Sequence, residues 1–442
     1  MTREELQKKT ISAISLGCDK NRVDLEHMLF VLKEYGFNIV QDVEEANIVI
    51  INTCAFIEPA ILEAIENIEY VLSLKRQGKV EKIIVSGCLP MRCKKEIEAE
   101  FPEIDAFITL QENKNITQVL ETIYDVPKNK FVCKNIGRII THGSKYAYLK
   151  IAEGCSNGCA YCTIPRIRGR FTSVPLDELV TEAKTLAQMG YKELILVAQD
   201  TARYGEDLPG NVNIITLLKE LIKIKNIEWI RLQYIYPEWL SDELLNFIYN
   251  NEKICKYIDM PLQHIDDRIL KEMNRKTGEE KSRAIVKKIK DNYPLITLRT
   301  TFIVGLPTET KKDFKKLCDF ITEAKIPYAS FFSYYREDKT KAYYMKQVPN
   351  FIKKRRLKKI EKLQNVVLNE YCLSKIGQEC LAMIDNFDYE TNIFYGHLQS
   401  TSPDVDLAVL IEKPQNVNLE IGKIYKTKIT QASACGFKGE II

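Results

Sequence analysis

Alternation of apolar and amphipathic segments is the feature that most constrains the fold of this chain. Across about the first 125 residues, short apolar runs at 11–16, 48–52 and 82–86 have the composition of strands. Between them, the segments 25–35 and 61–75 carry their apolar residues on one helical stripe. This order predicts an N-terminal α/β domain with a parallel sheet built from strand–helix–strand units.

Each of the three predicted strands runs into a cysteine, namely Cys18, Cys54 or Cys88. The carboxyl ends of parallel strands lie at one edge of a sheet, which is where open α/β sheets place ligands. Three thiolates far apart in sequence are therefore expected to face one crevice. A lone thiol is more often a small buried apolar residue, but three at equivalent strand ends indicate a shared metal cluster.

The middle of the chain repeats this alternation. Six candidate strands lie between residues 146 and 335, at 147–152, 193–198, 229–234, 257–260, 298–304 and 329–334. Intervening segments such as 176–189 and 312–324 have helical spacing. Six strand–helix units predict a partial (βα)6 barrel, whose active site is expected at the carboxyl edge of the strands.

The last part of the chain has a different pattern. A basic, leucine-bearing helix is predicted at 353–373, and short strands follow it. These candidate strands lie at 378–383, 393–397, 407–411 and 424–429. These four candidates indicate a small all-β barrel, which is expected to have five strands in all. The fold class is therefore α/β with three expected domains, at 1–130, 140–373 and 374–442.

Composition limits the classes of protein to which the chain can belong. Hydrophobic residues make up 45% and charged residues 28%, which indicates a folded globular protein rather than a disordered one. No stretch is long enough to span a bilayer and no apolar run follows the first charged residues, so a cytoplasmic protein without membrane contact is predicted. The net charge of +4 is weak evidence for nucleic-acid binding. The 13 cysteines, an odd number without a secretory signal, favour metal or catalytic thiols over disulfides.

The sharpest motif is the Cys-x3-Cys-x2-Cys run formed by Cys155, Cys159 and Cys162, with Gly154 and Gly158 beside it. Three thiolates in one tight loop bind three irons of a cubane cluster and leave the fourth open, as a cluster that binds and reduces a substrate requires. A zinc knuckle is the alternative, but zinc sites usually pair Cys-x2-Cys with a second ligand pair. No such pair follows nearby, so the spacing favours an iron–sulfur cluster.

This cysteine spacing resembles the radical S-adenosylmethionine enzymes. In that family the open iron chelates S-adenosylmethionine, and an electron from the cluster cleaves its sulfur–carbon bond to give a deoxyadenosyl radical. The resemblance implies that Tyr161, an aromatic residue beside the last cysteine, lies near the adenine. It also implies that Gln199, after the second barrel strand, contacts the amino end of the cofactor. Its neighbour Asp200 is expected either there or as a cap of the next segment.

Residues 163–170, Thr-Ile-Pro-Arg-Ile-Arg-Gly-Arg, resemble one branch of that family, the methylthiotransferases. Members of this branch carry an N-terminal three-cysteine domain and a C-terminal TRAM barrel. The resemblance makes Cys18, Cys54 and Cys88 the expected ligands of a second [4Fe-4S] cluster. The expected cofactors are therefore two [4Fe-4S] clusters and S-adenosyl-L-methionine.

Three segments resemble the branch that modifies a ribosomal protein: 15–21 with Lys20 in it, 234–238, and 259–264 with the acidic pair after it. Leu25 departs from that pattern, because the family usually has serine there, and the barrel segment 400–406 lacks the usual glycine. The resemblance implies methylthiolation of the β-carbon of an aspartate in small-subunit ribosomal protein twelve. The implied partners are that protein or the assembled subunit, and an unidentified electron donor.

Several alternatives stay open at this point. The same chemistry on adenosine in transfer RNA is one, and a zinc-containing RNA-binding protein without enzymatic activity is another. The basic run 353–359 either contacts RNA, together with the barrel, or is a solvated helix face. His264 either lines the pocket or makes a structural hydrogen bond. No catalytic side chain is predicted beyond the cluster ligands.

Overall fold

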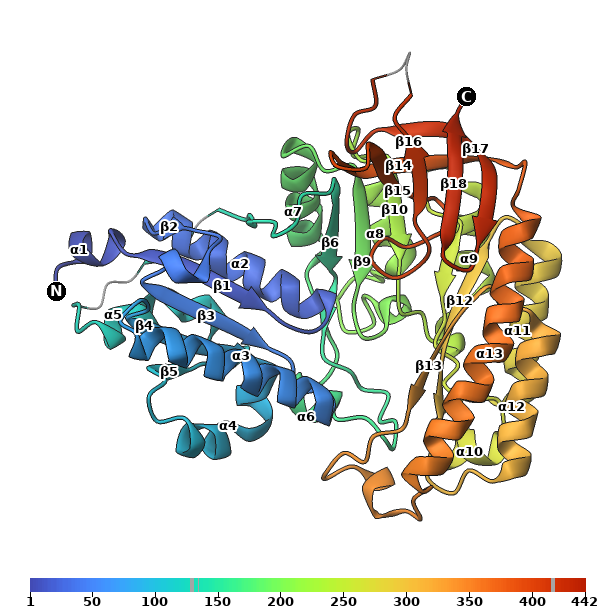
Figure 1. Ribbon diagram of the computed structural model, residues 1–442, viewed down its shortest axis with the longest axis horizontal. Helices are drawn as coiled ribbons and strands as arrows, with labels where there is room; N and C mark the ends of the chain where they lie inside the picture. Colours follow the sequence, from blue (N-terminus) through green and yellow to red (C-terminus); the bar gives the residue numbers. More distant parts are fainter. Residues whose placement is uncertain (128–130, 134, 415–417) are drawn as a thin grey trace. The chain divides into compact units, whose positions relative to one another are not determined.

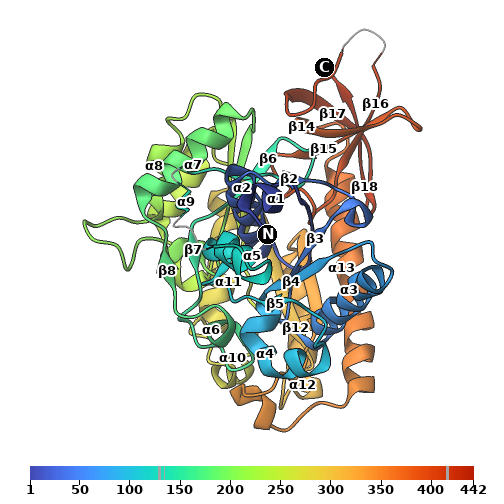
Figure 2. The same cartoon turned by 90° about the vertical axis from the view of Figure 1, so that its left-hand side faces the viewer.

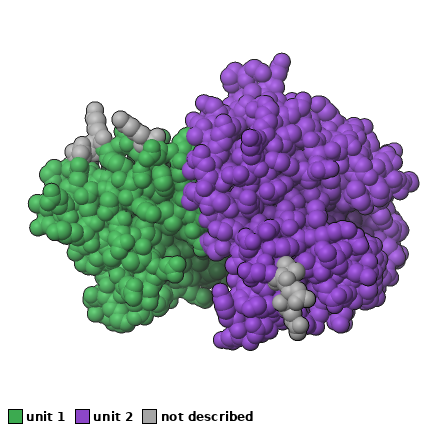
Figure 3. Space-filling view, turned by 90° about the horizontal axis from the view of Figure 1, so that it is seen from above, with its two compact units in different colours: residues 1–141, 153–156, 163–172 green, residues 142–152, 157–162, 173–442 purple. Residues whose placement is uncertain are grey.

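A computed structural model of the chain describes residues 1–127, 131–133, 135–414 and 418–442. The chain divides into two compact units (Figure 3). Unit 1 contains residues 1–141, 153–156 and 163–172, and unit 2 contains residues 142–152, 157–162 and 173–442. The predicted domain boundary at residue 130 lies outside the described residues. Within the described part of the chain, every helix is too short or too polar to cross a membrane.

Unit 1 contains a five-stranded parallel sheet with the strand order β2-β1-β3-β4-β5 (Figure 1). The strands are β1 (Thr10–Ser15), β2 (Asn38–Ile39), β3 (Ile48–Thr53), β4 (Lys82–Gly87) and β5 (Ala106–Phe107). The helices are α1 (Arg3–Gln7), α2 (Asp19–Tyr35), α3 (Glu58–Arg76), α4 (Cys88–Glu100), α5 (Ile116–Ile123) and the short α6 (Ile164–Ile167). The three strands and two helices that the sequence predicts are all present.

Two apolar cores cover the two faces of this sheet. Val49 and Ile51 of β3 pack into one core with residues of α3, whereas Ile48 and Ile50 pack into the other with residues of α2 and α5. Successive side chains of a strand point to opposite faces, so a strand buried on both faces needs a continuous apolar run. This requirement explains the sequence of β3.

Helix α2 begins earlier than the apolar pattern predicts, at Asp19 rather than residue 25. Cys18 has an extended backbone and precedes the helix directly, and its carbonyl accepts bonds from the N–H groups of Asn21 and Arg22. The first turns are polar yet partly buried: Lys20, Asn21 and Asp24 are all at most 9% exposed. These buried polar residues interrupt the apolar stripe from which the start of the helix was predicted, because they belong to the cysteine site rather than to the apolar core.

Unit 2 contains six parallel strands in two three-stranded sheets with the orders β10-β9-β6 and β11-β12-β13. The strands are β6 (Tyr146–Lys150), β9 (Glu193–Val197), β10 (Trp229–Leu232), β11 (Tyr257–Asp259), β12 (Thr297–Val304) and β13 (Tyr328–Ser333). A single bridge between Ile230 and Ile254, and a bond from the Ile235 N–H to the Asp259 carbonyl, join β10 to the β11 segment. All six predicted strands are present, and the sheet is interrupted in its middle.

Helices follow these strands in sequence. They are α7 (Leu176–Gln188), α8 (Ile214–Leu221), α9 (Asp242–Asn250), α10 (Asp267–Glu272), α11 (Glu279–Asn292), α12 (Lys311–Ala324) and α13 (Asn350–Ser374). Helix α13, the predicted basic helix, lies beside α12 and β13 (Figure 1). Two short strands, β7 (Ala152–Glu153) and β8 (Thr172–Ser173), flank the cysteine loop in sequence.

The C-terminal part of unit 2 is a closed five-stranded barrel with the order β14-β15-β16-β18-β17 (Figure 1, Figure 2). Its strands are β14 (Glu379–Asp388), β15 (Ile393–Leu398), β16 (Val409–Glu412), β17 (Ile424–Ser433) and β18 (Gly436–Ile441). Residues such as Ile384, Val409 and Phe437 fill its interior. At Gly396 a Cβ atom would collide with the carbonyl of Met383, so two strands approach closely there. The predicted small barrel is confirmed.

A buried network of charged side chains joins this barrel to β9. His397 of β15 contacts Asp385 through Nδ1 at 2.7 Å and Glu193 of β9 through Nε2 at 2.5 Å. Glu193 also accepts a bond from Nε of Arg231 at 2.7 Å. Burial alone would lower the pKa of His397, but the carboxylates of Asp385 and Glu193 outweigh it and raise this pKa to about 9.

The charged His397 predicts a pH dependence of stability. A pKa that is higher in the folded than in the unfolded chain stabilises the fold below the unfolded value of about 6.5, and this contribution disappears as the pH rises to about 9. We expect a loss of about 3 kcal/mol in the free energy of unfolding across this window. The variant His397→Gln should remove the loss, and His27→Gln in α2 should retain it. A flat profile for the parent chain would contradict the assignment.

Candidate functional site

The three cysteines of unit 1 lie at the same edge of its sheet. Cys18 follows β1 after a two-residue turn, Cys54 directly follows β3, and Cys88 is the first residue of α4 after β4. Each pair among the three thiols is close enough to interact electrostatically. The structure therefore brings together the residues that the sequence places at strand ends, although they come from three separate loops.

Two glycines make this close approach possible. Gly17 has φ +90°, and a Cβ atom there would lie 2.6 Å from Cβ and 3.0 Å from Sγ of Cys54. Gly87 has φ +92°, and a Cβ atom there would lie 2.7 Å from Oδ1 of Asn52 and collide with the carbonyl of Thr53. Both turns need the left-handed backbone and the missing side chain that only glycine combines without strain.

Burial changes the acidity of two of these thiols. Burial raises the pKa of Cys54, and it raises the pKa of Cys88 to about 12. Buried thiols with a raised pKa stay protonated at neutral pH in the absence of a metal. Bound iron would displace these protons, because its positive charge stabilises the thiolates. In the described ranges, no three His, Cys, Asp or Glu side chains lie close enough to hold a single metal ion. A cubane of four irons is larger, so its thiolates stand further apart.

A buried arginine accompanies the three thiols. The Arg168 side chain is 1% exposed, and its charge acts on Cys18, Cys54 and Cys88. From the sequence, Arg168 was identified only as part of the segment 163–170, which resembles the methylthiotransferases. Its contacts lie more than a hundred residues away along the chain, so no local pattern could have identified them.

The Cys-x3-Cys-x2-Cys loop is divided between the units: Cys155 belongs to unit 1, and Cys159 and Cys162 belong to unit 2. The Cys155 N–H donates to the Gly169 carbonyl at 3.1 Å. Within unit 2, the Cys162 N–H donates to the Cys159 carbonyl at 3.1 Å, which closes a tight turn. That turn presents both thiols from one short segment.

Tyr161, inside that turn, packs against the apolar cluster that contains Met273 and Leu306. Burial raises the pKa of Tyr161 well above its ordinary value, with a further contribution from Cys159. The ring is therefore a neutral, largely apolar wall. Its proposed contact with an adenine is compatible with this position and stays a prediction.

Cys159 has two polar neighbours that the sequence did not predict. Its Sγ lies 3.8 Å from Nη1 of Arg275 and 3.9 Å from the hydroxyl of Tyr236. The Arg275 guanidinium lies 4.2 Å from the centre of the Tyr236 ring, a cation–π contact. Tyr236 follows β10 at its carboxyl end, which is the one sequence signal that could have placed it in the site.

Asp200, which the sequence left between two roles, does not cap the next segment. Its side chain makes no cap bond to the helical turn Thr201–Arg203. Instead it accepts bonds from Asn157 Nδ2 at 3.2 Å and from the Tyr236 N–H at 3.4 Å. Burial raises the pKa of Asp200 to about 7. Its neighbour Gln199 is half-buried beyond the end of β9, and its contact with a cofactor stays a prediction.

Other candidates have structural contacts. His264 is fully buried, Nδ1 accepts a bond from the Asp266 N–H at 3.0 Å, and burial lowers its pKa to about 4, so the ring is neutral. In the basic run of α13, Lys353 donates to the Tyr334 carbonyl at 2.8 Å and Arg356 donates to Glu309 at 2.7 Å. These two cations face the protein interior, so the run is less available to RNA than its composition suggests.

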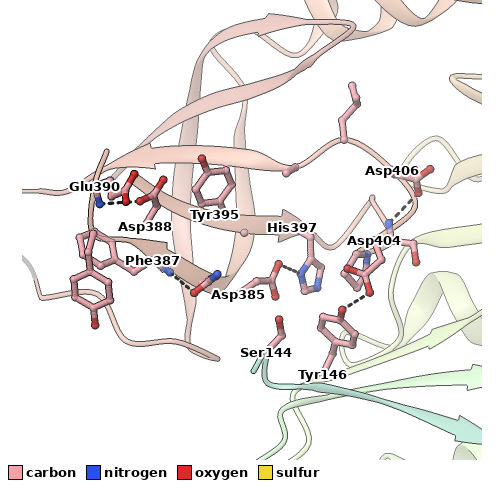
Figure 4. Close-up of a pocket in the computed structure, with 17 residues that line it drawn as sticks. Ser144, Tyr146, Asp385, Phe387, Asp388, Glu390, Tyr395, His397, Asp404 and Asp406 are labelled. Carbon is pink, nitrogen blue, oxygen red and sulfur yellow. Dashed lines mark hydrogen bonds and ion pairs between the residues drawn. The ribbon is translucent and has the colours of Figure 1, made fainter. Parts of the chain in front are cut away.

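Unit 2 also contains a cavity of about 920 Å³ beside the barrel (Figure 4). Five carboxylates line it: Asp385, Asp388, Glu390, Asp404 and Asp406. Aromatic rings share the lining, among them Tyr146 and Tyr395. His397 also lines the cavity and is paired with Asp385, and Asp406 is paired with Arg299 at 3.2 Å. The cavity is partly aromatic and keeps a surplus of carboxylates over cations, which favours cationic over anionic ligands.

Known proteins match the chain over nearly its whole length. Residues 149–321 match the radical SAM superfamily, residues 10–109 match the uncharacterized protein family UPF0004, and residues 376–442 match the TRAM domain. The ribosomal protein uS12 methylthiotransferase RimO of Thermoanaerobacter sp. (strain X514) is 41% identical over 98% of this chain and 100% of its own length. The protein of the same name from Alkaliphilus oremlandii (strain OhILAs) is 43% identical over 92% of this chain and 94% of its own length.

The chain belongs to the RimO family of radical SAM methylthiotransferases. Members of this family use S-adenosylmethionine and an iron–sulfur cluster, and so does this chain. Among solved structures, the radical S-adenosylmethionine methyltransferase TsrM from Kitasatospora setae has a TM-score of 0.57 at 11% identity and covers 76% of this chain and 77% of its own. The cobalamin-dependent enzyme OxsB has a TM-score of 0.52 at 12% identity, covering 82% and 57%. These two likenesses concern the fold alone.

The close approach of Gly17 to Cys54 leads to a prediction about the iron content of the purified protein. In Gly17→Ala the new Cβ would displace Cys54, so we expect iron to fall by about half while the iron of the Cys155 motif is retained. Gly78→Ala is the matched control, because Gly78 has φ +77° and a methyl group there would meet no other atom within 4 Å. It carries the same backbone strain without the collision. Equal iron contents in the two purified variants would contradict the role of Gly17.

Proposed function

We propose that this chain attaches a methylthio group to the β-carbon of an aspartate in ribosomal protein uS12. The observation that carries the choice of substrate is the 41% and 43% identity to two uS12 methylthiotransferases over nearly the whole chain. The gathering of Cys18, Cys54 and Cys88 around Arg168, in a chain that separately contains the radical SAM motif, supports the chemistry. Attachment of a methylthio group needs both a radical at carbon and a source of sulfur. Two cysteine sets supply a place for each.

We propose two [4Fe-4S] clusters. Cys155, Cys159 and Cys162 would hold the first, which with S-adenosylmethionine bound supplies a carbon radical able to take a hydrogen atom from the substrate. Arg275 would balance negative charge beside Cys159, and Tyr161 and Gln199 would line the cofactor pocket. Cys18, Cys54 and Cys88 would hold the second cluster, which supplies sulfur. The protein positions these groups and excludes water, because the difficult chemistry belongs to the cofactors.

The division of labour follows the expected domains. Residues 1–130 would carry the sulfur-supplying cluster, residues 140–373 the radical chemistry, and residues 374–442 the recognition of the macromolecular partner. The acidic cavity beside the barrel supports a basic protein as that partner, because carboxylates repel a phosphate backbone. The inward contacts of Lys353 and Arg356 support the same choice over transfer RNA.

Mass spectrometry of ribosomal proteins and transfer RNA tests the substrate. Cells that lack this gene should lose a methylthio-sized increment from one aspartate of uS12, and a plasmid copy of the chain should restore it. A Cys54→Ala copy should not restore it, whereas a copy with Cys435→Ala, an exposed thiol of the barrel, should. Loss of the increment from a transfer-RNA adenosine, with uS12 unchanged, would contradict the proposal.

A further inference from the structure

Arg168 joins parts of unit 1 that are far apart in sequence. Its Nη1 lies 3.1 Å from Oδ2 of Asp24 and 3.0 and 3.1 Å from the two carboxylate oxygens of Glu153. Its Nη2 lies 3.2 Å from Oδ1 of Asn21. The guanidinium therefore binds three residues through four oxygen atoms from an almost fully buried position, and charge-assisted bonds of this kind are among the strongest in proteins.

The partners of Arg168 are adjacent in sequence to the two cysteine sets. Asn21 and Asp24 lie in the first turns of α2, directly after Cys18, and Glu153 lies two residues before Cys155. The Gly169 carbonyl, next to Arg168, accepts the bond from the Cys155 N–H at 3.1 Å. One residue thus ties the segment after the first unit 1 cysteine to the segment that carries the first cysteine of the radical motif.

Further bonds make this connection rigid. Asn21 donates through Nδ2 to the Leu16 carbonyl at 2.7 Å, and its own carbonyl accepts a bond from Asn52 at 2.7 Å. Asn52 belongs to β3, two residues before Cys54. The network that begins at Arg168 therefore reaches the loops of both Cys18 and Cys54, and its charge also acts on Cys88.

Charge gives Arg168 a second role at the same place. The thiolates of a bound cluster, together with Asp24 and Glu153, would concentrate negative charge in a buried region, which is unfavourable without a cation. Guanidinium stays protonated when buried and offers a planar fork of donors, whereas lysine offers only a point charge. Substitution of Arg168 by lysine keeps the positive charge but loses the planar fork of donors, whereas substitution by glutamine removes the charge. The two contributions can therefore be tested separately.

We propose that Arg168 is a positioning residue that fixes Cys155 relative to Cys18, Cys54 and Cys88, and that its charge stabilises the reduced form of the cluster on those three thiols. This inference rests on the proposed function, which requires two clusters that act on one substrate carbon. Sulfur has to reach the carbon from which hydrogen was taken, and small misplacements of reacting groups slow such steps steeply. Arg168 would hold that spacing.

The test compares Arg168→Lys and Arg168→Gln with Arg170→Lys and Arg170→Gln in the full chain, reconstituted anaerobically with iron and sulfide. Arg170 is an exposed arginine two residues away. Electron paramagnetic resonance during a redox titration gives the potential of each cluster and the magnetic interaction between the reduced clusters. Neither reading needs a macromolecular substrate, so an error in the substrate assignment would leave both unaffected.

We expect Arg168→Gln to shift the potential of the unit 1 cluster to more negative values, because a nearby cation favours the reduced form. Arg168→Lys should keep that potential close to the parent value but weaken the magnetic interaction between the clusters. It should also raise the ratio of deoxyadenosine to methylthiolated product by about tenfold or more. If Arg168→Gln fails to retain the cluster, Arg168→Lys decides both roles: a potential far from the parent value would contradict the role of the charge, and an unchanged magnetic interaction would contradict the role in positioning. Potentials and interactions equal to those of the Arg170 variants would overturn the inference.

Discussion

The parallel register of β1, β3 and β4 is the constraint on which the unit 1 site depends. Ser15 pairs with Asn52, and Thr53 pairs with Gly87, so the three strands end at the same level of the sheet. A shift of one residue in any strand would turn its side chains to the opposite face and move its cysteine out of the group. The continuous apolar sequence of β3 and its two-sided core keep this register fixed.

Each cysteine set has a buried arginine beside it. Arg168 acts on the three thiols of unit 1, and Arg275 lies beside Cys159 in unit 2. Both side chains are buried, and both meet other polar groups as well as sulfur. A buried cluster with several thiolates carries negative charge, and arginine compensates it without the risk of deprotonation that lysine has in such surroundings. The repeated use of arginine is thus a physical consequence of burying thiolates.

Local sequence patterns predicted the main strands of both units, five of the longer helices and the three strand-end cysteines, because periodicity and chain order determine these features. They did not predict the short strands β2, β5, β7 and β8 or the last barrel strand, β18. They did not predict the start of α2, because buried polar residues such as Asn21 interrupt the apolar stripe. They also missed Arg168, Arg275 and Tyr236 as site residues. The bond from Arg168 to Asp24 spans 144 residues, and a contact of that kind exists only once the fold has formed. The inward position of Lys353 and Arg356 could not be predicted either, because their partners Tyr334 and Glu309 come close to them only in the folded chain.

Iron and sulfide analysis with Mössbauer spectroscopy tests most directly the claim that the chain holds two clusters on two cysteine sets. The parent chain and two triple alanine variants, one at Cys18, Cys54 and Cys88 and one at Cys155, Cys159 and Cys162, would be reconstituted under the same conditions. Two clusters on two cysteine sets would give about eight irons in the parent and about four in each variant, all in [4Fe-4S] clusters. A single cluster in the parent, or loss of all iron from either variant, would contradict the claim.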